Sequence, residues 1–349
     1  MKRIRCSAQI QGLLCTAGII ALSIATGCGG GPGPKPAPPE GGGSSPDPDG
    51  HRIKIAVIPK GTTHEFWKTA DAGALKAEEE LDVRVTWVGP TKEDDRAQQI
   101  EVVETQILNR MDGIVLAPLD AEALRRPVQE AVAQKVPVVI FDSGLNNSDD
   151  LVVSFVATDN YKGGELAGGK LAEILDGEGR VILLRYQEGS ASTDKREEGF
   201  LAAIARNPGI EVVSSEQYGG ATAAEAQQVS ENLLLRFSEG DRLTVEGIFC
   251  PNESTTYGML QALRRNRQAG SVKFIGFDAS KPLLEGLDAG EIHGLVLQNP
   301  FQMGYLGVKT MLQHLSGILV NSRIDTGVKL LTLENLHSEE MQAILNPPI

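Results

Sequence analysis

Cysteine and histidine are scarce in this sequence. Its 349 residues include four cysteines and five histidines. No Cys-x-x-Cys motif occurs and no two histidines stand at a spacing typical of metal ligands, so we expect neither a zinc site nor a metal cofactor. The sequence also lacks a Gly-x-Ser-x-Gly elbow, which is the usual framework of a nucleophilic hydrolase.

Positive charge is scarce as well. The sequence has 33 lysines and arginines against 46 aspartates and glutamates, for a net charge of −13 at pH 7. It contains no run of basic residues that could follow a phosphate backbone. We therefore expect no nucleic acid partner and a folded surface that repels anionic lipid.

The first 27 residues predict a secretory signal peptide. They include Lys2, Arg3 and Arg5 but no acidic residue. An apolar run over residues 13–24 follows, and it is too short to cross a membrane. We therefore expect the folded protein outside the cytoplasm, in the periplasm or at the cell surface.

A lipid attachment site is predicted where this leader ends. Residues 25–28 resemble the lipobox of bacterial lipoproteins, which predicts a lipid on Cys28 as the only membrane anchor. Ala25 stands where a leucine is usual, and an ordinary signal peptide that is cut nearby is the alternative. Residues 28–50 are nearly all Gly, Pro, Ser and Asp after this cysteine, so they predict a flexible tether. Cys250 ends an apolar strand and is predicted to be a core residue.

From residue 52 onward, strands and helices alternate at the spacing of βαβ units. The length suits two α/β domains, each with a core of its own. A further helix near 304–315 and a tail over 328–333 follow the last strand. The predicted strands are 53–58, 83–88, 113–117, 136–141 and 151–156 in the first half, and 180–184, 211–215, 247–250, 273–277 and 292–297 in the second.

Two apolar strands each end in an acid. Residues 136–141 lead into Asp142, and residues 272–277 lead into Asp278. Because strands this apolar are covered on both faces of a parallel sheet, both acids are expected at the carboxyl edge, where such sheets bind ligands. The repetition predicts two similar lobes that hold one small molecule, although an aspartate after a strand can also cap a helix or close a turn.

Seven short segments carry further information when they are taken in order. They are 63–67, 141–142, 157–160 with 163–164, 196–200, 251–253, 276–278 and 297–298. Together, over about residues 52–335, they resemble the ribose/galactose-type periplasmic sugar-binding proteins. This resemblance implies the type I periplasmic-binding-protein fold, in which two Rossmann-like lobes with parallel sheets are joined by three crossover segments and close about a hinge.

The resemblance also implies where the lobes divide. The N-terminal lobe would comprise 51–157 and 299–323, and the C-terminal lobe 158–298 and 324–349. The crossovers are expected near Ala157, near Asn299 and over 324–327.

Binding roles follow from the same resemblance. Phe66 and Trp67 would pack on the faces of a sugar ring, and acids and amides would hydrogen-bond its hydroxyls. Phe66 could instead be a core residue, His64 an exposed loop residue, and Asn252 a helix cap. Asp194 and Arg196 could form a surface ion pair. The predicted ligand-binding residues are His64, Phe66, Trp67, Asp142, Ser143, Asp194, Arg196, Asn252, Asp278 and Gln298.

Three of these positions depart from the ribose-binding pattern. His64 stands where the ribose binder has an amide, and Ser143 and Asp194 stand where it has arginines. Two cationic donors are therefore missing, although Arg196 could reach the site from nearby. For this reason we do not expect ribose to be the ligand.

The expected protein is a monomeric receptor that captures a monosaccharide or related polyol and delivers it to an ABC importer, and it is not an enzyme. A sugar sensor that signals to a membrane kinase is the main alternative. A sugar-converting enzyme with Asp142 and Asp278 as acid and base is another. Residues 164–170 resemble a P-loop, but Leu171 replaces the required Ser or Thr and no strand comes directly before them. We expect no nucleotide there, and we expect these glycines to let a helix approach a sheet closely.

Overall fold

The computed structural model describes residues 52–240 and 242–347. The predicted signal peptide, the lipid attachment site at Cys28 and the tether lie outside the described residues. None of the helices in the described ranges is both long and apolar enough to span a bilayer.

The first lobe is built on a six-stranded sheet. Its strands are β1 (Lys54–Ile58), β2 (Arg84–Trp87), β3 (Gly113–Leu116), β4 (Val138–Phe141), β5 (Ser154–Ala157) and β13 (Arg323–Asp325). They lie in the order β13-β5-β4-β3-β1-β2, and all neighbours are parallel. Every residue of β3 and β4 is buried, as expected for strands covered on both faces.

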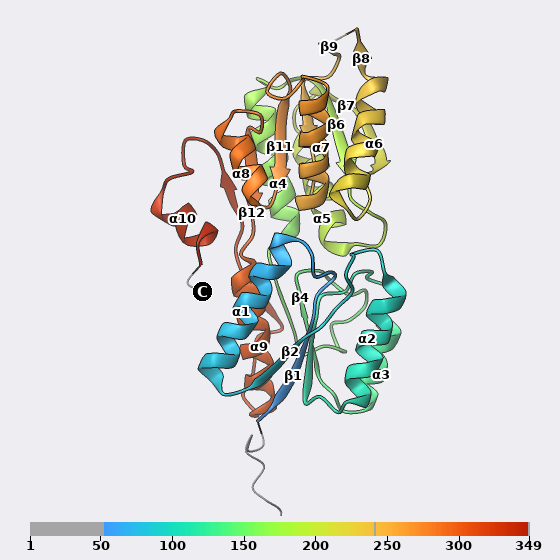
Figure 1. The fold of residues 1–349 in the computed structure, drawn as a ribbon, viewed down its shortest axis with the longest axis vertical. Coiled ribbons are helices and arrows are strands. Elements are labelled where there is room, and N and C mark those ends of the chain that lie inside the picture. Colours follow the sequence, from blue (N-terminus) through green and yellow to red (C-terminus); the bar gives the residue numbers. More distant parts are fainter. Residues whose placement is uncertain (1–51, 241, 348–349) are drawn as a thin grey trace, which may run out of the picture. The chain divides into compact units, whose positions relative to one another are not determined.

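Helices cover both faces of this sheet (Figure 1). They are α1 (Glu65–Leu81) and α9 (Pro300–Leu315) on one face, and α2 (Arg96–Leu108) and α3 (Arg125–Ala133) on the other. Each helix pair encloses its own apolar core against the sheet.

The second lobe repeats this plan on another six-stranded sheet. Its strands are β6 (Glu178–Arg185), β7 (Gly209–Tyr218), β10 (Gly247–Phe249), β11 (Lys273–Phe277), β12 (Gly294–Leu297) and β14 (Lys329–Leu331). The order is β14-β12-β11-β10-β6-β7, and only β14 runs antiparallel to its neighbour. A short pair, β8 (Ser238–Glu239) and β9 (Arg242–Leu243), lies apart from this sheet.

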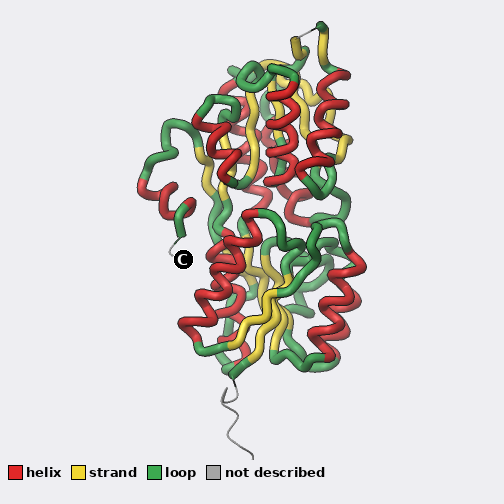
Figure 2. The backbone as a smooth tube through the Cα atoms, in the orientation of Figure 1, coloured by secondary structure: helices red, strands yellow, loops and turns green. Residues whose placement is uncertain are grey.

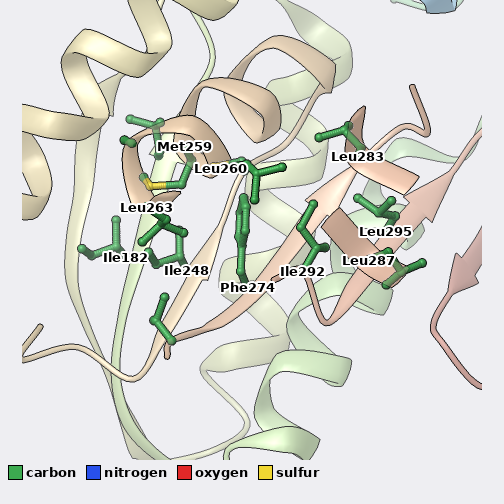
Figure 3. Close-up of a cluster of buried hydrophobic side chains, with 14 of the residues drawn as sticks. Ile182, Ile248, Met259, Leu260, Leu263, Phe274, Leu283, Leu287, Ile292 and Leu295 are labelled. Carbon is green, nitrogen blue, oxygen red and sulfur yellow. The ribbon is translucent and has the colours of Figure 1, made fainter. Parts of the chain in front are cut away.

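Helices again cover both faces, as Figure 2 shows for the two lobes. On one face lie α4 (Asn160–Ile174) and α5 (Ala191–Ile204), and on the other lie α6 (Ala223–Arg236), α7 (Glu253–Arg265) and α8 (Lys281–Asp288). The short helix α10 (Glu339–Leu345) packs against the second core through Met341. Figure 3 shows this core, with Phe274 of β11 surrounded by aliphatic side chains from α7, α8 and the neighbouring strands. Each such buried side chain contributes about 1.5–3 kcal/mol of hydrophobic stabilisation.

The chain passes between the two sheets three times, after β5, after β12 and after β13. The first and third passages are joined, because Thr326 N–H donates to the Ala157 carbonyl at 3.1 Å. These features confirm the predicted α/β fold. The edge strand β13 was not predicted, because its three residues are half or fully exposed and show no apolar run.

The glycine-rich segment 164–170 lies inside α4 and forms no phosphate-binding loop. A Cβ at Gly163, just before this segment, would lie 3.0 Å from the Phe277 ring on β11. The glycines inside the segment were expected to approach the sheet, and that expectation is wrong, because Gly164 and Gly168 face α5. The closest approach is to this other helix, since a Cβ at Gly164 would lie 1.9 Å from the Arg196 carbonyl oxygen on α5. Gly164 thereby sets how near α5 lies to α4.

Candidate functional site

A cavity lies between the two lobes and encloses about 330 Å³ of atom-free space, its opening included. Residues directly after β1, β4, β6, β11 and β12 line it, so the carboxyl edges of both sheets contribute. Eight of the ten predicted residues are among its lining: His64, Phe66, Trp67, Asp142, Arg196, Asn252, Asp278 and Gln298.

Asp142 and Asp278 occupy equivalent places in the two lobes. Both have a left-handed backbone, with φ of 59° and 68°, which aspartate tolerates better than most residues. Asp142 N–H donates to the Val156 carbonyl at 3.0 Å, and Asp278 N–H donates to the Val296 carbonyl at 2.9 Å. In both cases the acceptor lies on the neighbouring strand, which fixes the acid to its sheet.

Asp278 is held by two further hydrogen bonds. Its Oδ1 accepts from Gln298 Nε2 at 2.7 Å, and its Oδ2 accepts from Glu253 N–H, in the first turn of α7, at 3.0 Å. Asp278 does not cap the helix that follows it, because Ser280 occupies the N-cap position of α8. Burial raises the pKa of Asp278, against the opposing effects of Arg196 and Gln298.

Arg196 crosses the floor of the cavity and is buried. The surface ion pair considered for it is therefore wrong. Its donors bond Asn160 Oδ1 at 2.8 Å, the Pro251 carbonyl at 2.9 Å and Gln298 Oε1 at 2.8 Å. The guanidinium stacks 4.0 Å from the centroid of the Phe277 ring. Burial lowers the pKa of Arg196, but the charges of Asp278 and Asp142 oppose that shift. The planar guanidinium orients the side-chain amides of Asn160 and Gln298, and Asp142 Oδ1 lies 4.0 Å away.

Lys60 provides a second cation that sequence reasoning missed. Its ammonium donates to Ser190 Oγ at 3.1 Å and to Ser192 Oγ at 2.9 Å, both in the opposite lobe. It also lies 3.5 Å from Asp142 Oδ2. The cavity thus contains Lys60 and Arg196, and the inference that it lacks cationic donors is corrected.

Glu93 joins both lobes at one side of the cavity. Its Oε1 lies 2.6 Å from His64 Nδ1 and accepts a bond of 2.6 Å from Trp67 Nε1. Its Oε2 accepts from the Tyr186 hydroxyl of the second lobe at 2.5 Å. The Gln187 amide, also in the second lobe, donates to the Glu93 carbonyl at 2.8 Å.

These contacts shift the protonation of both partners. Burial alone would raise the pKa of Glu93, but His64, Lys60 and Tyr186 outweigh it and lower the pKa to about 2. Burial alone would lower the pKa of His64, but the Glu93 carboxylate outweighs it and raises the pKa to about 9. At neutral pH the two therefore form a charged pair.

The two aromatic residues take different positions on α1. Trp67 is 3% exposed and belongs to the buried face with Ala70, Ala74 and Ala77, whereas Phe66, the residue considered for the core, is half-buried. The spacing of three, four and three residues from Trp67 fits the helical period equally well. The rings meet edge to face with centroids 4.8 Å apart, and both line the cavity.

Asn252 serves as the cap of α7 and also lines the cavity. Its Oδ1 accepts from Thr255 N–H at 3.2 Å, so the capping role considered for it is real. The two roles are compatible, because the N-cap of α7 lies at the edge of the cavity.

Two predicted residues do not line the cavity. Ser143 is buried behind it, where its Oγ accepts from Ser192 N–H at 3.2 Å. Asp194 lies 3.6 Å from Arg185 with 38% of its side chain exposed. Residues two apart on a helix face different directions, so Asp194 cannot share the cavity with Arg196.

Other lining residues were not predicted: Lys60, Glu93, Tyr186, Ser192, Thr193 and Glu253. Lys60 and Tyr186 come just after β1 and β6, so the rule that found Asp142 applies to them too. Glu93 follows no strand directly and carries no such signal. Among the described residues, no group of three or more His, Cys, Asp or Glu side chains is placed to hold a metal ion.

Comparison with known proteins shows the family to which this chain belongs. The model of the periplasmic binding protein domain matches residues 55–318. The chain belongs to the periplasmic binding proteins. Curated relatives include the ribose import binding protein of Haemophilus influenzae, which is 28% identical over 80% of this chain and 91% of the relative. The D-ribose/D-allose-binding protein of Pseudomonas aeruginosa is 28% identical over 76% of this chain and 82% of the relative.

Solved periplasmic binding proteins share the fold and both lobes. A carbohydrate transporter solute-binding protein from Agrobacterium radiobacter, in complex with D-arabinose, is 33% identical with a TM-score of 0.80. The match covers 85% of this chain and 99% of that one. A solute-binding protein from Agrobacterium vitis with bound D-fucose is also 33% identical, with a TM-score of 0.80 over 83% of this chain and 99% of that one.

Proposed function

We propose that this periplasmic binding protein captures a monosaccharide or a related polyol between its lobes and delivers it to an ABC importer. The observation that carries the proposal is the composition of the interlobe cavity. Asp142 and Asp278 face it from opposite lobes, with amides beside them and the rings of Phe66 and Trp67 at one side. The names of its relatives, which include ribose, allose, arabinose and fucose, agree with this ligand class.

Sugar chemistry suits such a cavity. A sugar ring presents C–H groups to an aromatic face and hydroxyls around its rim, each of which can donate and accept. Carboxylates accept from these hydroxyls, while Lys60 and Arg196 donate to them. Charge-assisted bonds of this kind are about twice as strong as neutral ones.

Closure about the hinge is the second part of the proposal. Bonds across the cleft, such as Tyr186 to Glu93 and Lys60 to Ser192, form only when the lobes approach. A sugar that contacts both lobes therefore favours the closed state. The proposal assigns the protein no bond-making or bond-breaking step.

We further propose that a lipid on Cys28 holds the protein to a membrane outside the cytoplasm as a monomer. The support is the lipobox-like sequence and the family's periplasmic location. Mass spectrometry of the protein from membranes should find an acylated Cys28. Cys28→Ala should release the protein into the soluble fraction, and retention of that variant in membranes would contradict the anchor.

Ligand binding is tested with purified full-length protein. D-ribose, D-allose, D-arabinose, D-fucose, D-tagatose, D-galactose and myo-inositol are titrated in a calorimeter and in thermal melts. At least one should bind with a Kd in the micromolar range or below and raise the melting temperature. If no sugar in the panel binds or raises the melting temperature, the proposal is wrong. A change in the mass of the bound sugar during incubation would show an enzyme instead.

A further inference from the structure

A second cavity adjoins the sugar site. It encloses about 470 Å³, its opening included, and lies between the start of α1, the loop after β11, the segment after β12 and α10. The two cavities share four lining residues: Phe66, Glu253, Asp278 and Gln298. We call this second space the side chamber.

The walls of the side chamber differ from those of the sugar site. Beyond the shared residues, five apolar residues line the side chamber, and Glu65, Thr69 and Ser280 are the polar ones. The apolar five are Ala279, Leu297, Pro300, Ile344 and Leu345. In the sugar site, by contrast, the residues around the shared four are mostly charged or hydroxyl-bearing. A sugar hydroxyl placed against these aliphatic walls would lose its bonds to water without replacing them.

Charge narrows the class of occupant further. Glu65, Glu253 and Asp278 line the side chamber, and no basic residue is among the described residues that line it. An anionic group such as a phosphate or a carboxylate would face acids without a counter-charge. A neutral, nonpolar group meets the aliphatic walls without this cost.

The partition between the cavities consists of the four shared side chains. Asp278 and Gln298 are held by their mutual bond and by Arg196. Glu253, in contrast, is held from the opposite lobe by backbone N–H groups at the start of α1, with Phe66 N–H at 3.2 Å from its Oε2. A group that passes from one cavity to the other therefore requires the Glu253 side chain to rotate about its three torsions and to give up these bonds.

We propose that the ligand is a sugar with a neutral, nonpolar substituent, as in an aryl or alkyl glycoside. The sugar ring occupies the interlobe cavity, and the substituent passes Glu253 into the side chamber. This inference rests on the proposed function, because it specifies which sugars that site accepts. The observation that carries it is that the two cavities are adjacent and are separated only by four side chains that line both.

The first test compares substituted with free sugars on the full-length protein. The monosaccharide that binds best in the panel above is titrated beside its α- and β-phenyl glycosides and its 1-phosphate. One phenyl anomer should bind within about tenfold of the free sugar or more tightly, and the phosphate should bind more weakly than either. If the free sugar binds and both phenyl anomers are weaker by more than about tenfold, the inference is wrong and the proposed function stands. If no member of the panel binds, the proposed function fails and the inference with it.

A second test fills the side chamber. Leu345→Trp should weaken the phenyl glycoside by about tenfold or more while the free sugar changes less than about twofold. Leu319→Trp, at a site that is 98% exposed, makes the same chemical change away from both cavities and should alter neither affinity. Ile344→Phe provides a milder filling variant should Leu345→Trp not fold. Equal weakening of both ligands, or no selective effect from either filling variant, would overturn the inference.

Discussion

The Tyr186 hydroxyl donates a hydrogen bond of 2.5 Å to Glu93, and the two residues belong to different lobes. Glu93 also accepts from Trp67, an aromatic side chain of the cavity. One carboxylate therefore connects the position of an aromatic wall with the closure of the cleft. The bond is buried, and hydrogen bonds to a charged acceptor contribute about 1.5–3 kcal/mol.

Tyr186→Phe removes this donor and keeps the ring. Because the bond exists only between approached lobes, its loss should shift the protein toward the open state. We expect sugar affinity to fall by about 10- to 100-fold, which corresponds to the contribution of one charged hydrogen bond. Calorimetry measures the affinity, and small-angle scattering without ligand measures the shift in radius of gyration.

Tyr161→Phe is the matched control for this variant, since Tyr161 lies on α4 and is 40% exposed. It should leave affinity and scattering unchanged. An unchanged affinity in Tyr186→Phe would show that the Glu93 bond does not contribute to closure.

Asp142→Asn and Asp278→Asn should each weaken sugar binding by about 10- to 150-fold, because each replaces a charged acceptor with a neutral amide. Asparagine tolerates the left-handed backbone of both positions, so the variants should fold. Calorimetry with the best-bound sugar measures the loss, and circular dichroism checks the fold.

Asp176→Asn makes the same change at an exposed aspartate whose φ is 54°. It controls for the backbone and for the loss of one charge. If either cavity variant keeps the native affinity for the sugar, the acid replaced in it does not contribute to binding.

Gly164→Ala should destabilise the protein by about 1–3 kcal/mol, since its Cβ would meet the Arg196 carbonyl oxygen at 1.9 Å. The displaced α5 should also move the Arg196 guanidinium and weaken sugar binding. Chemical denaturation and calorimetry measure the two effects.

Gly169→Ala, on the same helix α4, has no atom within 4 Å of the added Cβ. Alanine favours a helix over glycine by about 1 kcal/mol, so this variant should be slightly more stable than the native protein. Equal effects of the two substitutions would contradict the close-packing argument.

Stability should fall as pH rises from about 5 to about 9. Burial raises the pKa of Glu253 to about 7 and that of Glu197 also to about 7, so the folded state holds these protons more tightly than the unfolded chain. Raising the pH through this interval removes that advantage. The raised pKa of His64, about 9, extends the decline, because its stabilising charge is lost above neutrality. Denaturant titrations at pH 5, 7 and 9 measure the trend.

Glu253→Gln should make the decline between pH 5 and 7 shallower, with the contribution of Glu197 remaining, and should leave the part above pH 7. The carboxylate of Glu93, with a pKa of about 2, should affect stability only below about pH 4.5, where the unfolded chain begins to take up its proton. Stability that increases from pH 5 to 9 would contradict these assignments.

The strands of both sheets were predictable, because β3, β4, β10 and β11 are apolar runs between helical segments. The edge strand β13 was not, since its residues form no apolar run and its pairing depends on the hinge. Sequence periodicity also left open which aromatic of α1 is buried. Trp67 has that place because Glu93 accepts its indole N–H, a contact between segments that no local pattern shows.

The acids Asp142 and Asp278 were found because the end of an apolar strand marks the edge of a parallel sheet. Lys60 and Tyr186 also follow strands, but the same residue type does not occur at the equivalent position of the other lobe, so no repeated pattern marks them. Glu93 could not be found this way, because its place depends on how the loop after β2 packs across the cleft. Its identification required coordinates from both lobes.

The backbone bonds that tie Asp142 and Asp278 to neighbouring strands have a mechanical consequence. The backbone of each acid moves with its own sheet, so the distance between the two acids changes when the lobes move relative to each other. The two carboxylates therefore report the distance between the lobes when a ligand is bound between them. A ligand that is too short or too long to contact both acids leaves the lobes at a different separation. Only a ligand of matching length allows the other interlobe bonds, such as Tyr186 to Glu93, to form.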